Sequence, residues 1–559
     1  MHTRKYNILL LFLYLFLSAC ADKKDQRDIA SNPEDLQERV EDLLKNFADT
    51  VNAPPLPFLD SSIVLNQPGI ARFLYKRNVS GPFWSNKDNW KPEGDSLFAF
   101  INSAQLFGLF PEDYHRDEIK EIRNRFSTDS LGKKDRKNVL LWTKAEILLT
   151  DAFIHIIRDL YLGRLPNDSI SLSKDSVLTE EFLARQLDEM NRQGFSAMIS
   201  ALEPRQRGYH LLKAGIKKFL DSAEYRSYTP VPYPEKDISK FTKALQSRLY
   251  EGGFISFDSV KADSAQLAEA VKSFQKKKGL AVDGRAGEAT VRMMNVNDRE
   301  KFIRIAISLD KYKKMPRQMP SKYIWVNASA NLLELVDQGE VKLRSKVICG
   351  KAKTRTPVLT SQISELITYP QWVPPPSIVS KEILPAVKRN PGYLARKGFR
   401  LVDSKGNTID PYSVNWSRYG SAIPYRIIQG SGDANALGIM KFVFNNKYSV
   451  YLHDTNQRYL FSSSNRSLSH GCVRVQEWEK LTWYLLRNDN LSEKSGQDNR
   501  VDSVKSWLSQ KQKRSIALRN KVPLYIRYLT CEGENGNIVF YDDVYSEDKM
   551  LREKYFSTK

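Results

Sequence analysis

The spacing of apolar residues changes from a helical period to a strand period near residue 322. Upstream of this point, apolar side chains recur every three or four positions, as Leu36, Val40 and Leu43 do, and this spacing places them on one face of a helix. Downstream, apolar and polar residues alternate, as in 341–344, which is the period of a half-buried strand. The chain is therefore predicted to begin with helical modules and to continue into a β-rich domain.

The helical part divides into a large and a small module. In the large one, residues 35–235, the strongest helical run extends from Val139 to Leu162 and ends at a break that contains glycine and proline. Its His155 is interpreted as a core or surface histidine rather than a ligand. No motif in this module indicates chemistry, so we expect a mostly helical support without a catalytic site.

The small module is predicted over residues 236–296. Two helix faces are marked by Ile238, Phe241, Leu245 and Leu249 and by Leu267, Val271 and Phe274. Glycines and the Asp283-Gly284 turn separate short helices in the remainder. The pattern predicts a compact three-helix domain, and the helical period then continues through a connector at 297–321.

The β-rich domain is predicted over residues 322–546. Its strands are expected at 323–327, 332–336, 341–349, 364–368, 450–453, 522–529 and 537–540, with a hairpin turn at 337–340 and a helix at 475–486. Residues 370–436 interrupt the domain without strand alternation, and so long an insertion in a compact sheet is usually functional, for example as a lid. Residues 547–559 are predicted to be a charged tail. The fold class is thus α+β and multidomain.

The chain of 559 residues carries a formal net charge of +21. A basic surface can bind nucleic acid, anionic lipid or an anionic polymer. Nucleic acid is disfavoured, because the sequence has no recognition motif and no Lys/Arg-rich arm. Since the charge is dispersed, a merely solvated basic surface remains the alternative to an anionic partner.

The first residues have the order of a secretory signal. Arg4 and Lys5 precede an apolar run at 8–17, which is short for a membrane span. Leu17-Ser18-Ala19-Cys20 resembles a bacterial lipobox, in which Cys20 becomes the lipidated first residue. The alternative is a plain signal peptide with an incidental cysteine.

We accordingly expect a signal peptide at 1–19 and a polar tether at 20–34. The mature protein would lie in the periplasm, anchored to a membrane by lipid, and the sequence leaves open which membrane that is. Of the other cysteines, Cys349 and Cys531 lie in apolar, strand-like contexts. They are predicted to be two buried free thiols, with a disulfide between them as the alternative.

The candidate chemistry lies in Ser469-His470-Gly471-Cys472-Val473-Arg474, whose Cys472 is nineteen residues after His453. Catalysis by a thiol requires a thiolate, which a neighbouring base or cation can supply. Of the six histidines in the chain, the two in the last third both belong to this constellation. One cysteine and two histidines could instead ligate zinc, but no CxxC or HxxxH spacing supports a metal site.

These residues, together with Leu437-Gly438-Ile439-Met440-Lys441-Phe442, resemble the catalytic domain of the L,D-transpeptidases of the YkuD type. That family carries a histidine followed by a Ser/Thr-His-Gly-Cys block. Many members have Asn where Arg474 stands, and Arg there resembles the large Gram-negative subgroup with several modules. Three regions of this chain resemble the modules of that subgroup. Residues 35–235 resemble its scaffold domain, residues 236–296 its peptidoglycan-binding domain, and the insert at 370–436 its capping subdomain.

The resemblance implies roles for individual residues. Cys472 would be the nucleophile and His453 the base, an order that spacing alone could not decide, and His470 would be an orienting residue. The N–H groups of Gly471 and Cys472 would hold the oxyanion with help from Tyr451. Contacts to substrate are expected from Arg474, Ser469, Trp372 and Tyr425. Arg474 could instead pair with an acid, and the two rings could be structural. His453 could be oriented by Asp454 or by a backbone carbonyl.

The implied reaction is acyl transfer through a thioester on peptidoglycan stem peptides, giving 3→3 cross-links without a metal or organic cofactor. The alternatives are an L,D-carboxypeptidase, a transferase that attaches a protein to the wall, or a non-catalytic lipoprotein that binds peptidoglycan. Partners implied by the resemblance are stem peptides, glycan and proteins of cell-wall synthesis.

Overall fold

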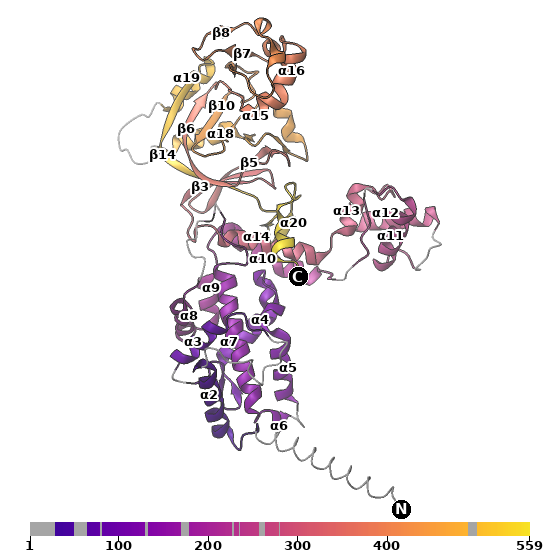
Figure 1. Cartoon of the computed structure of the whole chain (residues 1–559), viewed down its shortest axis with the longest axis vertical. Coiled ribbons are helices and arrows are strands. Elements are labelled where there is room, and N and C mark those ends of the chain that lie inside the picture. Colours follow the sequence, from indigo (N-terminus) through magenta and orange to yellow (C-terminus); the bar gives the residue numbers. More distant parts are fainter. Residues whose placement is uncertain are drawn as a thin grey trace, which may run out of the picture.

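The computed structural model describes residues 28–49, 64–78, 81–128, 132–168, 171, 178–225, 228–233, 235–256, 263–278, 280–489 and 500–559. The predicted signal peptide and Cys20 lie outside these ranges. Figure 1 shows a helical module at one end, a β-rich domain at the other, and a small helical domain to one side. The α+β multidomain class is confirmed. No helix among the described residues has the length and apolarity needed to cross a bilayer.

The helical module is built around one long central helix. Its helices are α2 (Pro33–Asp49), α3 (Pro68–Arg77), α4 (Pro92–Ser103), α5 (Arg116–Ser127), α6 (Gly132–Asp135), α7 (Val139–Tyr161), α8 (Glu180–Gln193), α9 (Phe195–Leu202) and α10 (Arg207–Ser222), with the short turns η1 (Ala104–Phe107) and η2 (Pro111–Tyr114) and a two-residue hairpin, β1 (Ser85–Asn86) with β2 (Asn89–Trp90). The α7 helix is apolar on nearly all sides and is accordingly buried.

Two buried carboxylates of α7 accept hydrogen bonds from the loops that surround this helix. Glu146 accepts hydrogen bonds from Trp84 N at 3.0 Å and Ser85 Oγ at 2.7 Å, and burial raises its pKa to about 6. Asp151 accepts from Gln67 N at 2.8 Å and contacts His115 Nε2 at 2.8 Å. These carboxylates satisfy backbone donors that would otherwise be buried without partners, so their role is structural.

The small domain contains α11 (Ile238–Glu251), α12 (Ser264–Lys277) and α13 (Glu288–Asn295). Gln275, which is 1% exposed, joins α12 to the turn that follows. Its Nε2 donates to Asp283 Oδ1 at 2.8 Å and Thr290 Oγ1 at 3.0 Å, and its Oε1 accepts from Gly284 N at 2.9 Å. The glycine-punctuated stretch of the sequence is therefore held by one buried amide.

The connector forms helix α14 (Asp298–Lys313), which packs between the helical module and the β-rich domain (Figure 1). Asp310 accepts from Arg164 N at 2.6 Å, and Lys313 Nζ donates to Asp159 O at 2.7 Å. The first contact is part-buried and the second is buried, so α14 is fixed to the helical module.

The prediction of a charged tail at 547–559 is wrong. Residues Glu547–Tyr555 form helix α20, which packs on α14, and Phe556 is 1% exposed against Phe110. Several of its charges are paired, as Arg552 is with Glu300 at 2.8 Å. The segment has too few apolar residues to give a helical period, and its docking depends on partners distant in sequence.

The β-rich domain contains one nine-stranded sheet. Its strands are β3 (Lys322–Asn327), β4 (Leu332–Asp337), β5 (Glu340–Gly350), β6 (Leu359–Thr368), β10 (Met440–Phe444), β11 (Leu452–His453), β12 (Ser467–Ser469), β13 (Val473–Val475) and β14 (Arg514–Arg527). The order is β12-β5-β13-β11-β10-β6-β14-β3-β4, and β4 also pairs with β5. The sheet thus closes on itself, and helices α18 (Trp478–Arg487) and α19 (Arg500–Ser509) pack against it.

The last predicted strand does not join this sheet. β15 (Cys531–Glu534) and β16 (Asn537–Phe540) form a separate hairpin that lies against α10 of the helical module. A Cβ on Gly533 would lie 2.0 Å from Leu211 O, so only glycine allows this approach. Cys349 and Cys531 are both buried free thiols, as predicted.

The insert at 370–436 is a subdomain with its own core. It contains α15 (Pro376–Ile378), the π-helical turn η3 (Val379–Ile383), α16 (Leu384–Arg389), α17 (Tyr393–Arg396), η4 (Pro411–Ser413) and η5 (Trp416–Arg418), and a three-stranded sheet of β7 (Phe399–Val402), β8 (Thr408–Ile409) and β9 (Arg426–Gln429). The expectation of a segment without strands is wrong here, because these strands are too short to show alternation in the sequence.

Candidate active site

Cys472 lies in a tight turn between β12 and β13. Gly471 has a φ of 118°, a conformation that other residues rarely adopt. Ser469 Oγ donates to Cys472 O at 2.6 Å and accepts from Gly471 N at 3.1 Å. Ser469 is predicted to contact substrate, but it is 2% exposed and both bonds close the turn. That prediction is wrong, because the hydroxyl is used to shape the backbone around the cysteine.

The catalytic candidates share one face of the sheet. His453 of β11 is paired with Arg474 of β13 on one side and with Lys441 of β10 on the other. Extending the register of β11 and β13 by one residue places Tyr451 opposite Cys472. Because side chains alternate along a strand, these residues lie on the opposite face of their strands from the core residues Phe442, Leu452 and Val473, and Tyr451 and Cys472 still border that core.

Ring contacts agree with this placement. The Tyr451 and His453 rings have centroids 5.6 Å apart, and Lys441 Nζ lies 3.9 Å from the Tyr451 ring centroid. The face therefore brings together a thiol, an imidazole, a phenol and two cations.

The resting protonation state of the pair is neutral. Burial raises the pKa of the Cys472 thiol, although Tyr451 and the charges of Lys441 and Arg474 oppose this rise. Burial lowers the pKa of His453 to about 3, and Arg474 and Lys441 act in the same direction. At neutral pH the site holds a thiol near an uncharged imidazole, which is a form able to accept a proton.

The structure does not use the Asp454 carboxylate to orient His453. Asp454 accepts from Ile439 N at 3.1 Å and pairs with Arg458 at 2.6 Å. Gly438 has a φ of 62° and leaves room for that carboxylate, since a Cβ there would lie 2.3 Å from it. Nδ1 of His453 has no hydrogen-bond partner among the described residues, while the backbones of Leu437 and Asp454 favour its charged form.

Of the two backbone N–H groups predicted to hold the oxyanion, that of Gly471 already has a hydrogen-bond partner. Gly471 N–H donates to Ser469 Oγ, so it does not point at a substrate. Within the described ranges, Cys472 N–H makes no hydrogen bond. The Cys472 amide is therefore the backbone donor that remains at the site, beside the Tyr451 side chain.

Arg474 and His470 occupy different environments. Arg474 donates to Gln457 Oε1 at 2.9 Å, and no acid pairs with it in the described part of the chain. His470 is turned toward the insert, where its Nε2 contacts the Glu382 carboxylate of η3. The first residue therefore remains available to an anion, and the second joins the catalytic turn to the insert.

Of the two aromatic residues predicted to contact substrate, only Trp372 lies near the catalytic face. Trp372 lies at the border of insert and sheet, where its N–H and C=O bond Gln429 at 3.1 and 2.7 Å, and its side chain favours the ionised form of Tyr451. Tyr425 packs against Tyr419 inside the insert, and no described contact joins it to Cys472. Trp372 is brought to the catalytic face and Tyr425 is not.

Sequence reasoning missed Lys441 and Glu382. The alternation Met440-Lys441-Phe442 carries a signal for the first, because it places a lysine on the polar face of the strand that pairs with His453. Glu382 lies 88 residues from His470, in a turn whose sequence shows no chemical motif. No group of three or more metal-binding side chains occurs among the described residues.

Three family models match parts of the chain. Residues 321–487 match "YkuD: L,D-transpeptidase catalytic domain", residues 70–215 match "Scaffold domain", and residues 239–294 match "Putative peptidoglycan binding domain". A curated "Putative L,D-transpeptidase" of Haemophilus influenzae is 36% identical over 228 residues, which cover 41% of this chain and 45% of the relative. The match thus spans less than half of that protein.

A solved structure of an L,D-transpeptidase (residues 123–326) from Xylanimonas cellulosilytica is also similar. It is 16% identical, with 55% of this chain and 98% of that chain covered. The TM-score is 0.14.

Proposed function

We propose that this protein forms 3→3 cross-links between peptidoglycan stem peptides, because residues 321–487 match the L,D-transpeptidase catalytic-domain model and other parts of the chain match a scaffold domain and a putative peptidoglycan-binding domain. The observation that carries the proposal is the shared face of Cys472, His453 and Arg474. It offers a nucleophile, a neutral base and a cation within one row of side chains.

In the proposed reaction, the Cys472 sulfur attacks the carbonyl carbon of the third residue in a tetrapeptide stem. His453 accepts the thiol proton, and the tetrahedral oxyanion is held by the Cys472 N–H and the Tyr451 hydroxyl. Collapse breaks the amide bond to the terminal D-Ala, whose nitrogen takes the proton from His453. The product is a thioester and free D-Ala.

The second half of the reaction uses an amine from a neighbouring stem. Its nitrogen attacks the thioester carbon and loses a proton to His453, the C–S bond breaks, and the thiol regains that proton. Water in place of the amine would yield a tripeptide, which is the carboxypeptidase reaction. Arg474 would bind a substrate carboxylate, for which its planar guanidinium is suited.

Incubation of the purified protein with tetrapeptide muropeptides, followed by mass analysis, tests this function. We expect 3→3 dimers and released D-Ala. Tripeptide alone would establish the carboxypeptidase alternative. No product, together with no labelling of Cys472 by a carbapenem, would leave a peptidoglycan-binding lipoprotein. The small domain is proposed to bind glycan, which pull-down on purified sacculi would measure directly.

The insert is proposed to exclude water from the thioester until an amine arrives. We expect Trp372→Ala to raise the ratio of tripeptide to 3→3 dimer several-fold, because Trp372 lies where the insert meets Tyr451. Tyr412→Ala is the matched control, since this ring of the insert is 69% exposed. If both products fall together at an unchanged ratio, the insert only positions the donor.

The protein is further proposed to be a lipoprotein of the periplasm, on the lipobox-like sequence that ends at Cys20. We expect Cys20→Ala to move the protein from the membrane fraction to the soluble periplasmic fraction, with carbapenem labelling of Cys472 in detergent unchanged. A protein that remains in the membrane fraction after this substitution would contradict lipid anchoring. Anchoring of this kind would also bring it near proteins of cell-wall synthesis.

A further inference from the structure

The loop 350–356 holds the catalytic turn from outside the sheet. Thr354 Oγ1 donates to Ser469 O at 2.9 Å, and Thr356 Oγ1 donates to Gly471 O at 2.9 Å. A Cβ on Gly350 would lie 2.0 Å from Thr354 O, so the loop folds tightly back on the end of β5. The two carbonyls on either side of His470 are thus both fixed by threonine hydroxyls of one loop.

The hydrogen bond to Gly471 O also fixes the direction of the Cys472 N–H, the proposed oxyanion donor. Carbonyl and N–H of one peptide unit lie in a plane and point in opposite directions. The N–H that belongs to the Gly471 carbonyl is that of Cys472, so the direction of one sets the direction of the other. The Thr356 hydroxyl also accepts from Gly350 N at 2.8 Å, while it donates its single proton to Gly471 O.

Thr356 is itself held by Tyr545, from the segment that precedes α20. The Tyr545 hydroxyl accepts from Thr356 N at 3.1 Å and donates to Gly350 O at 3.0 Å, so it bridges both ends of the loop. Tyr545 is 3% exposed and stacks on Tyr528 with ring centroids 4.7 Å apart. Tyr545 N also donates to the Tyr528 hydroxyl at 3.0 Å.

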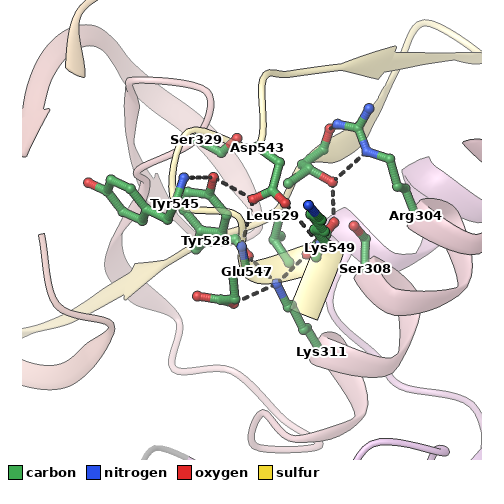
Figure 2. A network of polar contacts seen from close by, with 12 residues as sticks. Arg304, Ser308, Lys311, Ser329, Tyr528, Leu529, Asp543, Tyr545, Glu547 and Lys549 are labelled. Atoms are coloured by element: carbon green, nitrogen blue, oxygen red, sulfur yellow. Dashed lines mark hydrogen bonds and ion pairs between the residues drawn. The ribbon is translucent and has the colours of Figure 1, made fainter. Parts of the chain in front are cut away.

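Figure 2 shows how this tyrosine pair is anchored. Asp543 accepts from Tyr528 Oη, Glu547 N and Lys549 N at 2.9, 2.9 and 3.0 Å. Lys311 of α14 donates to Tyr528 O at 2.8 Å and pairs with Glu547 at 2.7 Å. A continuous series of hydrogen bonds therefore runs from the connector helix through the C-terminal segment to the catalytic turn.

We propose that Thr356 and Tyr545 are positioning residues that aim the Cys472 N–H at the oxyanion. The inference rests on the proposed acyl transfer by Cys472. Neither side chain contacts the thiol, so both act through the Gly471–Cys472 peptide. Loss of either hydroxyl lets this peptide rotate, which weakens a donor that matters only while negative charge develops on the carbonyl oxygen.

Two reactions of the same cysteine separate this role from a merely structural one. A carbapenem acylates the thiol through a tetrahedral oxyanion: the C–S bond forms, the lactam C–N bond breaks, and the thiol proton passes to the lactam nitrogen. Iodoacetamide alkylates the thiolate by displacing iodide, and no oxyanion forms. A misaimed N–H slows the first reaction only, whereas a loosened turn changes both.

The experiment measures both rates at Cys472 by peptide mass spectrometry, in the full chain with Thr356→Val or Tyr545→Phe. We expect Thr356→Val to slow acylation about tenfold or more, less than the loss of a whole oxyanion donor, and Tyr545→Phe to slow it less. Alkylation should keep its rate and its pH profile in both. Thr356→Ser should restore acylation, because it retains the hydroxyl. Tyr555→Phe is the control, because Tyr555 packs against the cluster with Phe302 and, within the described residues, its hydroxyl makes no hydrogen bond to the loop 350–356.

Acylation at the parental rate in both variants, or an equal loss in both reactions, would overturn the positioning role. If Thr356→Val fails to fold, Tyr545→Phe decides, since it removes one oxygen and leaves the stacked ring. Failure of the proposed function looks different: the carbapenem would then leave Cys472 unmodified in the parent protein.

Discussion

Replacing Cys472 by serine is expected to reduce cross-link formation at least about a thousandfold while leaving the fold intact. A serine hydroxyl is much less acidic than a thiol, and the site already opposes ionisation, because burial raises the pKa of Cys472. His453 has a lowered pKa and is therefore a weak base. One weak base that suffices for a thiol does not suffice for an alcohol.

The measurement is the initial rate of 3→3 dimer formation from tetrapeptide muropeptides, with thermal unfolding and binding to sacculi as checks on the fold. Cys531→Ser gives the matched control, because this buried free thiol lies in the β15–β16 hairpin, outside the catalytic sheet. Activity of the serine variant within tenfold of the parent would remove Cys472 as the nucleophile.

The sequence was sufficient for the elements that carry local periodicity. The alternation in Val450-Tyr451-Leu452-His453 predicts a strand that ends at His453, and β11 ends there. The turn expected at 337–340 is present, with positive φ at Gln338 and Gly339. Helix α7 starts at Val139, as its apolar run predicts. In each case the signal lies within a few residues of the element it specifies.

Contacts between distant segments were not predictable in this way. The hydroxyl of Ser469 turns inward because the turn between β12 and β13 closes on it, a geometry that the motif alone leaves open. The bond between Thr356 and Tyr545 joins residues 189 positions apart. Both residue types are common in cores and loops, so only the folded arrangement gives them a place near the chemistry.

The C-terminal segment, predicted to be a charged tail, is also ordered by contacts with distant segments. A run of mixed charges reads as solvated in a single sequence, because charges are rarely buried unless they are paired. Here the partners are Glu300, Lys311 and Asp113, on elements far upstream. The segment is ordered by charges supplied by other modules and by one buried ring, that of Phe556.

Replacing His453 by alanine is expected to slow acylation of Cys472 by about a hundredfold to ten-thousandfold, the range of general acid–base catalysis. His470→Ala should be much milder, because His470 contacts Glu382 of the insert rather than the row formed by Lys441, His453 and Arg474. The measurement is carbapenem acylation followed by mass. If His470→Ala proved the more damaging, the assignment of the base would have to be reversed.

The pH profile of the parent protein tests the same base without mutation. Burial lowers the pKa of His453 to about 3, so the neutral, proton-accepting form persists as the pH falls from 7 to 5. A histidine with an ordinary pKa of about 6.5 would be mostly protonated at pH 5, and acylation would fall about thirtyfold below its plateau. We therefore expect an acylation rate that changes little between pH 7 and 5 and declines only at lower pH. The rate of alkylation by iodoacetamide should instead rise toward high pH, because this reaction requires the thiolate and the pKa of Cys472 is raised.

An acylation profile with an acidic midpoint near pH 6.5 would contradict this expectation. It would mean that His453 is solvated in the working enzyme, and that the insert does not keep water from the base.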